Sequence, residues 1–108
     1  MSTSGVIEWC EWCKADSGRT HAKRACCAAR RASIIPGFGR IDAILAVSNE
    51  HGPEAGKQFR VDVLRAMAMR LARANKPRRL AQYGRLSVED LELVKKMTME
   101  EYEKGAAA

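Results

Sequence analysis

The sequence predicts a mainly α-helical protein, a small bundle of four to five helices with an N-terminal Cys-rich loop. All four cysteines lie between residues 10 and 27, apolar residues recur at helical spacing from residue 41 onward, and few windows alternate with the period of a strand. A chain of 108 residues suggests one domain. We divide it into a Cys-rich loop with the first helix (1–31), a helical core (32–76), a basic linker (77–86), and a C-terminal helix with its tail (87–108).

The Cys-rich loop has the spacing of a metal site. Cys10 and Cys13 form a C-x-x-C pair, His21 follows after seven intervening residues and Cys26 after four more, with Cys27 beside it. A C-x-x-C turn places two thiolates on one side of a tight loop, and two further ligands then close a tetrahedron around Zn²⁺. The stretch therefore predicts a zinc-binding loop, with these five residues as candidate ligands.

The choice among the later ligands stays open in the sequence. Adjacent residues rarely both reach one metal, so Cys27 is an alternative to Cys26. If residues 21–31 are helical, His21 and Cys26 point about 140° apart, and His51, the only other histidine, becomes a candidate for the last position. The non-metal interpretation is that the two adjacent cysteines are small buried hydrophobes on an Ala-rich helix.

The chain has no features of export or of a membrane span. Residues 1–5 are polar and uncharged, with no apolar run of signal-peptide type behind them. No stretch approaches the length of a transmembrane helix. We therefore expect a cytoplasmic protein with no membrane partner. Thiols stay reduced in that compartment, which favours metal ligands or free thiols over disulfides.

The first two helices are predicted from turn and capping signals. We expect an extended lead over residues 6–12 and then a helix over 21–33 with Thr20 as its cap. The run Pro-Gly-Phe-Gly at 36–39 ends that helix. A short amphipathic helix of about ten residues follows and ends at His51, where Gly52 provides a left-handed C-terminal cap.

Two longer helices complete the predicted bundle. Pro53 opens the longest one, which runs to about residue 75. Its apolar residues recur every four positions and form either the core or a dimer seam, so a homodimer is an open possibility; they are Phe59, Val63, Met67 and Leu71. Ser87 is expected to cap the last helix, which reaches about residue 104. Thr98 repeats the capping pattern, so this segment forms one helix or two.

The charge of the chain favours an acidic partner. The net charge is +6 and the isoelectric point about 9.5. Residues 57–85 hold nine Lys or Arg and one acid, a balance of +8, whereas residues 86–108 hold six acids and three Lys, a balance of −3. A phosphate-facing surface is one interpretation and an ordinary solvated face the other. The candidate residues are Arg19, Lys23, Arg24, Arg30, Arg31, Arg70, Arg73, Lys76, Arg78, Arg79 and Arg85.

The cysteine spacing resembles a stretched zinc knuckle, the C-x2-C-x4-H-x4-C module that binds single-stranded nucleic acid. The outer spacings match, and the middle one is three residues longer here. An aromatic residue between the first two cysteines, here Trp12, is also usual in that family. The resemblance implies that Trp12 stacks on bases and that the loop binds nucleic acid; the alternative is that Trp9 and Trp12 shield the metal and supply core.

A second resemblance covers about half of the chain. An Arg-x-x-Cys-x-x-Arg helix is followed by a Pro, an Arg that opens a short apolar helix, an acidic-x-Gly end, and a helix rich in Ala, Leu and Arg. This run is similar to small uncharacterised proteins of temperate phages and prophages, which implies an accessory or regulatory protein that binds a host factor. The residues that carry it are Arg24, Cys27, Arg30, Pro36, Arg40, Glu50 and Gly52.

The sequence offers no catalytic set. No Ser/His/Asp order, paired carboxylates or phosphate loop stands out, and C-x-x-C zinc sites are usually closed and structural. We therefore expect a non-enzymatic phage-type accessory protein that binds and modulates a host protein in the cytoplasm of a bacterium. The alternative is a zinc-dependent nucleic-acid-binding transcriptional regulator.

Overall fold

Five helices and no strands make up the part of the chain that the structure describes. The computed structural model describes residues 8–15, 17–35, 37–74 and 86–107. The helices are α1 (Glu11–Lys14), α2 (Ala25–Ile34), α3 (Gly37–His51), α4 (Pro53–Ala74) and α5 (Val88–Ala107). The predicted fold class, a small helical bundle with a Cys-rich N-terminal segment, is confirmed.

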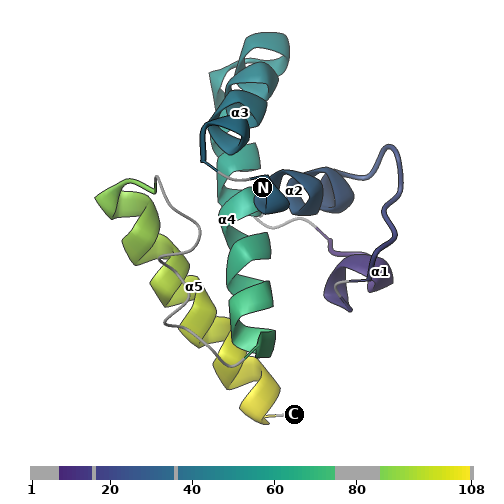
Figure 1. The fold of residues 1–108 in the computed structure, drawn as a ribbon, viewed down its shortest axis with the longest axis vertical. Helices are drawn as coiled ribbons and strands as arrows, with labels where there is room; N and C mark the ends of the chain where they lie inside the picture. Colours follow the sequence, from purple (N-terminus) through teal and green to yellow (C-terminus); the bar gives the residue numbers. More distant parts are fainter. Residues whose placement is uncertain (1–7, 16, 36, 75–85, 108) are drawn as a thin grey trace.

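Helix α4 is the centre of the bundle. Helices α2, α3 and α5 each pack against it, while the short α1 lies to one side against α2 (Figure 1). The predicted apolar stripe of α4 forms the core, with Val63 and Met67 fully buried and Leu71 2% exposed. Ala29 and Ala32 of α2 and Val94 and Met97 of α5 complete this core.

The turn between α3 and α4 forms as its sequence predicts. Gly52 has a φ of +98°, in the left-handed region that favours glycine, and its N–H donates to the carbonyl of Ser48 at 2.9 Å. Pro53 begins α4 directly afterwards. The two helices then approach closely, because a Cβ on Gly56 would lie 2.6 Å from the Cβ of Ser48.

Helix α5 is a single helix held to α4 by opposite charges. The hydroxyl of Ser87 accepts the N–H of Asp90 at 3.1 Å, which is the predicted cap. Thr98 does not start a second helix, because its hydroxyl donates to the Val94 carbonyl within the same helix at 2.6 Å. The acids of α5 pair with arginines of α4: Asp90 with Arg60, and both Glu100 and Glu101 with Arg65.

The structure corrects several predicted boundaries. Part of the expected extended lead is the helix α1, and α2 begins at Ala25, so residues 21–24 are not helical. Thr20 therefore caps nothing, and the N-cap of α2 is Arg24, which makes no side-chain capping bond. Helix α3 begins at Gly37, where φ is +54°, so Phe38 and Gly39 lie inside the helix that they were expected to precede.

Two further findings concern the limits of the described chain. The predicted basic linker, residues 77–86, lies outside the described residues except for Leu86. Among the helices that are described, none combines the length and the apolar character needed to cross a bilayer.

Candidate metal centre

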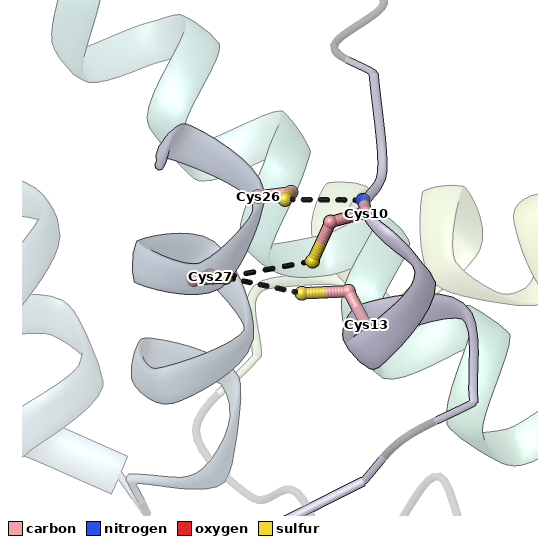
Figure 2. Close-up of side chains that lie close together, drawn as sticks. All are labelled: Cys10, Cys13, Cys26 and Cys27. Carbon is pink, nitrogen blue, oxygen red and sulfur yellow. Dashed lines mark hydrogen bonds between the residues drawn. The ribbon is translucent and has the colours of Figure 1, made fainter. Parts of the chain in front are cut away.

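Four cysteine sulfurs lie close together between α1 and α2. Cys10 directly precedes α1 and Cys13 lies within it, while Cys26 and Cys27 belong to the first turn of α2. All four Sγ atoms lie within 4.8 Å of one another. The Sγ of Cys27 is 3.7 Å from those of both Cys10 and Cys13 (Figure 2). The four cysteines can therefore hold a metal ion.

The two sulfur separations of 3.7 Å, from Cys27 to Cys10 and to Cys13, match the edge of a tetrahedral metal site. With Zn–S bonds of about 2.3 Å, the edge of an ideal ZnS₄ tetrahedron is about 3.8 Å long. A disulfide, in contrast, requires sulfurs about 2.05 Å apart. Four thiolates this close would repel one another strongly, so ionising all four requires a cation among them.

The start of α2 explains how adjacent cysteines reach one site. Successive residues of a helix point about 100° apart, so a site midway between the directions of Cys26 and Cys27 lies about 50° from each. Because α2 begins at Ala25, both cysteines sit at its open N-terminal end, facing α1. The expectation that only one of the two reaches the site does not fit this geometry, since both sulfurs belong to the cluster.

The C-x-x-C pair is presented by a single helical turn. Cys10 has extended backbone at the start of this turn, and its carbonyl accepts the N–H of Lys14 at 2.9 Å. Residues three apart in such a turn lie on the same face. That spacing brings the sulfurs of Cys10 and Cys13 to the side that faces α2 (Figure 2).

Hydrogen-bond donors surround the sulfurs. The backbone N–H of Cys10 donates to the Sγ of Cys26 at 3.3 Å, and that of His21 donates to the Sγ of Cys27 at 3.2 Å. The Nε–H of Arg30 donates to the Sγ of Cys13 at 3.3 Å. Such donors delocalise thiolate charge and fix the orientation of the ligands, so the surroundings suit a cluster of negative sulfurs.

Arg30 organises the loop between α1 and α2. Its guanidinium donates to the carbonyls of Ser17 and Arg19 in addition to Cys13. The side chain is only 5% exposed. Its predicted place on a phosphate-facing surface is therefore wrong. A signal was present in the sequence, because Arg30 follows Cys26 by one helical turn and so lies on the same face of α2.

Neither histidine belongs to the group of four ligand atoms. The Nδ1 of His21 lies 3.5 Å from the Sγ of Cys27, at the edge of the cluster. Its ring stacks on Trp12, with the ring centroids 4.0 Å apart and the planes inclined by 11°. His51, the other candidate, is exposed at the end of α3. Four cysteines can supply a complete tetrahedron without either of them.

The tryptophans support the site in two ways. Trp9 packs against both the bundle core and the buried cysteines, so it joins the two parts of the molecule. Trp12 is partly buried, stacked on His21, and has the guanidinium of Arg19 5.8 Å from its ring centroid. These contacts occupy ring surface that the knuckle resemblance assigned to bases.

The thiols of the C-x-x-C pair differ in acidity. Burial acts to raise the pKa of Cys10, but the backbone N–H of Cys13 and the neighbouring thiols donate hydrogen bonds that together lower it to about 6. Burial raises the pKa of Cys13 to about 12, against the opposing hydrogen bond from Arg30. The thiol cluster therefore contains one acidic and one weakly acidic sulfur within the same turn.

The predicted basic surface is only partly within the described chain. Arg19, Lys23, Arg24 and Arg31 are exposed, as is Lys14, which sequence reasoning missed. Arg70 is partly buried and donates to the hydroxyl of Ser33 at 3.4 Å. Arg73 belongs to the end of α4. Four further predicted residues lie outside the described chain: Lys76, Arg78, Arg79 and Arg85.

An open hollow lies beside Cys10. Both tryptophans, His21 and the cations Lys14 and Arg24 contribute to its walls, together with Glu8 and Glu11. The interaction of Arg24 with the Cys26 thiol raises the pKa of its guanidinium, which keeps this cation firmly charged. Aromatic and cationic groups thus share one surface next to the sulfurs.

Comparison with models of protein families, with curated proteins and with solved structures finds no match for this chain.

Proposed function

We propose that this chain is a zinc-stabilised, non-enzymatic protein that binds nucleic acid through the surface around its cysteine cluster. The observation that carries the proposal is the hollow beside Cys10, where the cations Lys14 and Arg24 lie among aromatic side chains next to the clustered sulfurs. Phosphate oxygens are the natural partners of these cations.

Zinc is the metal that best suits these ligands. A tetrahedral set of four thiolates favours zinc or an iron–sulfur centre. Native mass spectrometry of the reduced protein measures how many metal ions each chain, with its four cysteines, binds. We expect one zinc ion per chain and a colourless protein. A metal-free folded protein contradicts the metal claim, and a coloured protein containing iron contradicts the choice of zinc.

The role of the ion is structural in this proposal. Four cysteine ligands fill the tetrahedron and leave no open position for a reacting water, in contrast to catalytic zinc sites. Holding α1 against α2 fixes the loop between them, which carries Arg19 and Lys23. The metal would then shape the binding surface rather than take part in a reaction.

The hollow beside Cys10 supports nucleic acid as the ligand. Trp9 can contact a base, because Trp12 and His21 are stacked on each other, and Lys14 and Arg24 can contact phosphates although Glu8 and Glu11 share the walls of the hollow. Base–aromatic contact combined with a cationic groove is typical of proteins that bind single strands. Single-stranded RNA or DNA is therefore the expected class, although Trp12 already stacks on His21.

Charge reversal at two adjacent exposed residues tests the surface. We expect Lys23→Glu combined with Arg24→Glu to weaken binding of a fluorescent single strand at about 50 mM salt by at least about tenfold. The salt slope should fall by about two. The matched control is Lys95→Glu with Lys96→Glu, an adjacent exposed pair on α5. No binding by the unaltered protein at low salt, or equal losses in the two variants, would refute the proposal.

Measuring the zinc content of the charge-reversal variants separates the claim of zinc binding from the claim of nucleic-acid binding. Because Arg24 lies close to Cys26, the metal content of the Lys23→Glu, Arg24→Glu variant must stay at one ion per chain for the binding result to count. If zinc is present and nucleic acid does not bind, the metal claim stands and the ligand claim falls.

A second candidate is binding to a host protein, which the resemblance to prophage proteins implies. The observation that favours it is a set of exposed large apolar residues at the end of α2 and on α3, including Phe38 and Leu45. Co-purification of one host protein from bacterial cells, lost on Leu45→Glu and kept on Lys23→Glu with Arg24→Glu, would select this candidate.

A further inference from the structure

Cys10 is the most accessible of the four clustered cysteines. It is half-buried, whereas Cys13, Cys26 and Cys27 are each at most 3% exposed. Of the four, Cys10 is also the one that lines the open hollow beside the cluster. Partial exposure distinguishes reactive cysteines from inert buried ones. A small solute in the hollow can therefore reach Cys10 while the other three cysteines stay shielded.

The walls of the hollow suit a small uncharged reactant. The cations Lys14 and Arg24 are matched there by the carboxylates of Glu8 and Glu11, so the formal charges of these four side chains cancel. Hydrogen peroxide carries no charge and is not much larger than water, so neither sign of charge excludes it. It oxidises an accessible cysteine to a sulfenic acid, which condenses with a second thiol when one is near.

Cys27 is the sulfur closest at hand for that second step. Its Sγ lies 3.7 Å from the Sγ of Cys10, across the gap between α1 and α2 (Figure 2). A disulfide requires a separation of about 2.05 Å, so one sulfur must move. Cys10 lies before the first residue of α1 and has extended backbone, which leaves it outside the helix and able to turn towards α2.

The hydrogen bonds at the other two sulfurs also favour Cys27. The buried guanidinium of Arg30 donates to Cys13 at 3.3 Å, and the guanidinium of Arg24 interacts with Cys26. Cys27 accepts a neutral backbone N–H at 3.2 Å. Hydrogen bonds from a charged donor are roughly twice as strong as neutral ones, so they hold a thiolate in place and weaken it as a nucleophile.

We propose that Cys10 is a peroxide-reactive site, and that its oxidation joins it to Cys27 in a disulfide that expels the metal ion. The metal release rests on the zinc site proposed above, whereas the disulfide requires only the thiols. The cluster would then sense an oxidant in addition to ordering the loop between α1 and α2.

The reaction balances with hydrogen peroxide as the oxidant. The thiolate of Cys10 attacks one peroxide oxygen, the O–O bond breaks, and a sulfenic acid and a hydroxide form. The thiolate of Cys27 then attacks the sulfenic sulfur, the S–S bond forms, and a second hydroxide leaves. Two thiolates, one peroxide and two protons from solvent thus give one disulfide and two waters, as two electrons pass from sulfur to oxygen.

The disulfide would remove two of the four ligands at once. Cys13 and Cys26 alone make up half of a tetrahedral thiolate site, which is too few ligands for a structural zinc ion. The new bond would still join α1 to α2, because its two cysteines come from opposite sides of the loop. Oxidation therefore differs from chelation, which removes the metal and leaves no link in its place.

Peroxide treatment of the full, zinc-loaded chain followed by peptide mapping tests the pairing. Cleavage after Glu11 separates Cys10 from Cys13, and tryptic cleavage separates both from Cys26 and Cys27. Fragmentation of the linked peptide then distinguishes the last two. The expected product is a Cys10–Cys27 disulfide, with one zinc ion released for each disulfide formed and rebound after reduction by a thiol.

Two matched substitutions test Cys27 as the second sulfur. Cys26→Ser and Cys27→Ser each remove one thiol from the first turn of α2, so both weaken metal binding for the same reason. Cys26→Ser should still form the disulfide of Cys10 on peroxide treatment. Cys27→Ser should instead accumulate the sulfenic acid on Cys10, trapped by dimedone at least about tenfold more than in Cys26→Ser.

Alkylation tests the accessibility of Cys10 without any oxidant. When the zinc-loaded chain is treated with limiting N-ethylmaleimide, Cys10 should be labelled first, at least about tenfold faster than the three buried cysteines. Faster labelling of any of those three would overturn the assignment of Cys10 as the reactive sulfur.

The mapping experiment separates this inference from the proposed function. A disulfide between Cys10 and Cys13, or equal trapping in the two variants, overturns the role of Cys27. Thiols that stay reduced with zinc still bound after peroxide overturn the inference as a whole and leave the zinc site intact. A chain that holds no zinc before oxidation refutes the metal claim and its release, while the mapped disulfide still decides the pairing.

Discussion

The helical bundle and the cysteine-rich lobe of this protein are held together by different interactions. The bundle has one cluster of nine buried apolar residues from three helices, among them Val63, Leu64 and Met67. The lobe, formed by residues 8–24 and the first turn of α2, has a buried cluster of only Cys13, Cys26 and Cys27. The bundle can rely on apolar burial, while on our proposal the lobe depends on a metal ion held by its sulfurs.

This difference shows how a short chain can order a segment that lacks a core. A loop without buried apolar area cannot offset the entropy of fixing its backbone. A metal ion offers a large binding free energy at one point instead, and Arg30 extends that order to the carbonyls of Ser17 and Arg19. Trp9 contacts both clusters and is the apolar link between the two parts.

Removing the metal should produce the largest effect, and it should fall on the lobe alone. Structural zinc binding is worth about 10–16 kcal/mol in small zinc modules. Because both tryptophans lie in the lobe, chelation should change the tryptophan fluorescence strongly while most of the helical circular dichroism persists. Cys13→Ser should give the same result without a chelator.

Two outcomes of the chelation experiment would contradict the division of the molecule. Unchanged fluorescence after verified metal loss would mean that the lobe is ordered without its ion. Simultaneous loss of fluorescence and helical signal would mean that the bundle depends on the lobe. A bundle variant that keeps its zinc, such as Met67→Ala, serves as the control for metal content.

Truncating a bundle core residue should destabilise the bundle without affecting the metal. Met67 is fully buried, so Met67→Ala should reduce the free energy of unfolding by about 2–5 kcal/mol. Met99→Ala makes the same chemical change at a side chain that is 52% exposed, and should cost less than about 0.5 kcal/mol. Urea unfolding followed by circular dichroism measures both. Loss of zinc in Met67→Ala would show that the two regions are coupled.

The sequence predicted the bundle more fully than the lobe. The four-residue repeat that begins at Phe59, the left-handed Gly52 and the cap at Ser87 are local signals, and each is present in the structure. Local signals suffice for the bundle because the spacing of apolar residues within one segment predicts an amphipathic helix there. The start of α3 was missed because Gly37 and Gly39 usually end helices rather than begin them, whereas its end at His51 was predicted.

The lobe was harder to predict because its order comes from contacts between segments. The C-x-x-C pair is visible in the sequence, but the joint use of Cys26 and Cys27 depends on where α2 begins. That start is shifted from His21 to Ala25, and Arg24, the residue before it, has extended backbone. The metal, the partner and the prophage resemblance stay predictions.

Adding a single methyl group should lower the stability of the protein when it is placed in the tightly packed bundle, but not when it is placed in the open loop. A Cβ on Gly56 would lie 2.6 Å from the Ser48 Cβ and 3.0 Å from the Ser48 Cα. Gly56→Ala should therefore cost about 1–3 kcal/mol of unfolding free energy, despite the better helix propensity of alanine. Gly18→Ala in the lobe meets no atom within 4 Å and should be nearly neutral. Partial recovery in Gly56→Ala with Ser48→Gly would locate the cost in this contact, and a neutral Gly56→Ala would contradict it.

The smallest expected effect concerns Asp62, a buried carboxylate of the bundle whose burial is only partly compensated by hydrogen bonding. Burial raises the pKa of Asp62 above its usual value, and the amide of Gln58, which donates to Oδ1 at 2.9 Å, opposes this only in part. The carboxylate is thus less favourable in the folded state than in the unfolded state. Its cost is absent below the unfolded pKa of about 3.9 and develops as the pH rises through the folded pKa.

Asp62→Asn should therefore stabilise the bundle at pH 7 and change little near pH 3. The amide resembles the protonated acid and keeps an oxygen that can accept the hydrogen bond from Gln58. Glu92→Gln, at an exposed position on α5, is the control for the loss of one negative charge. Urea unfolding of both variants at the two pH values isolates the Asp62 contribution, because the other carboxylates titrate equally in variant and parent. A variant less stable than the parent at pH 7 would mean that the charge of Asp62 is stabilised by a partner in the folded state.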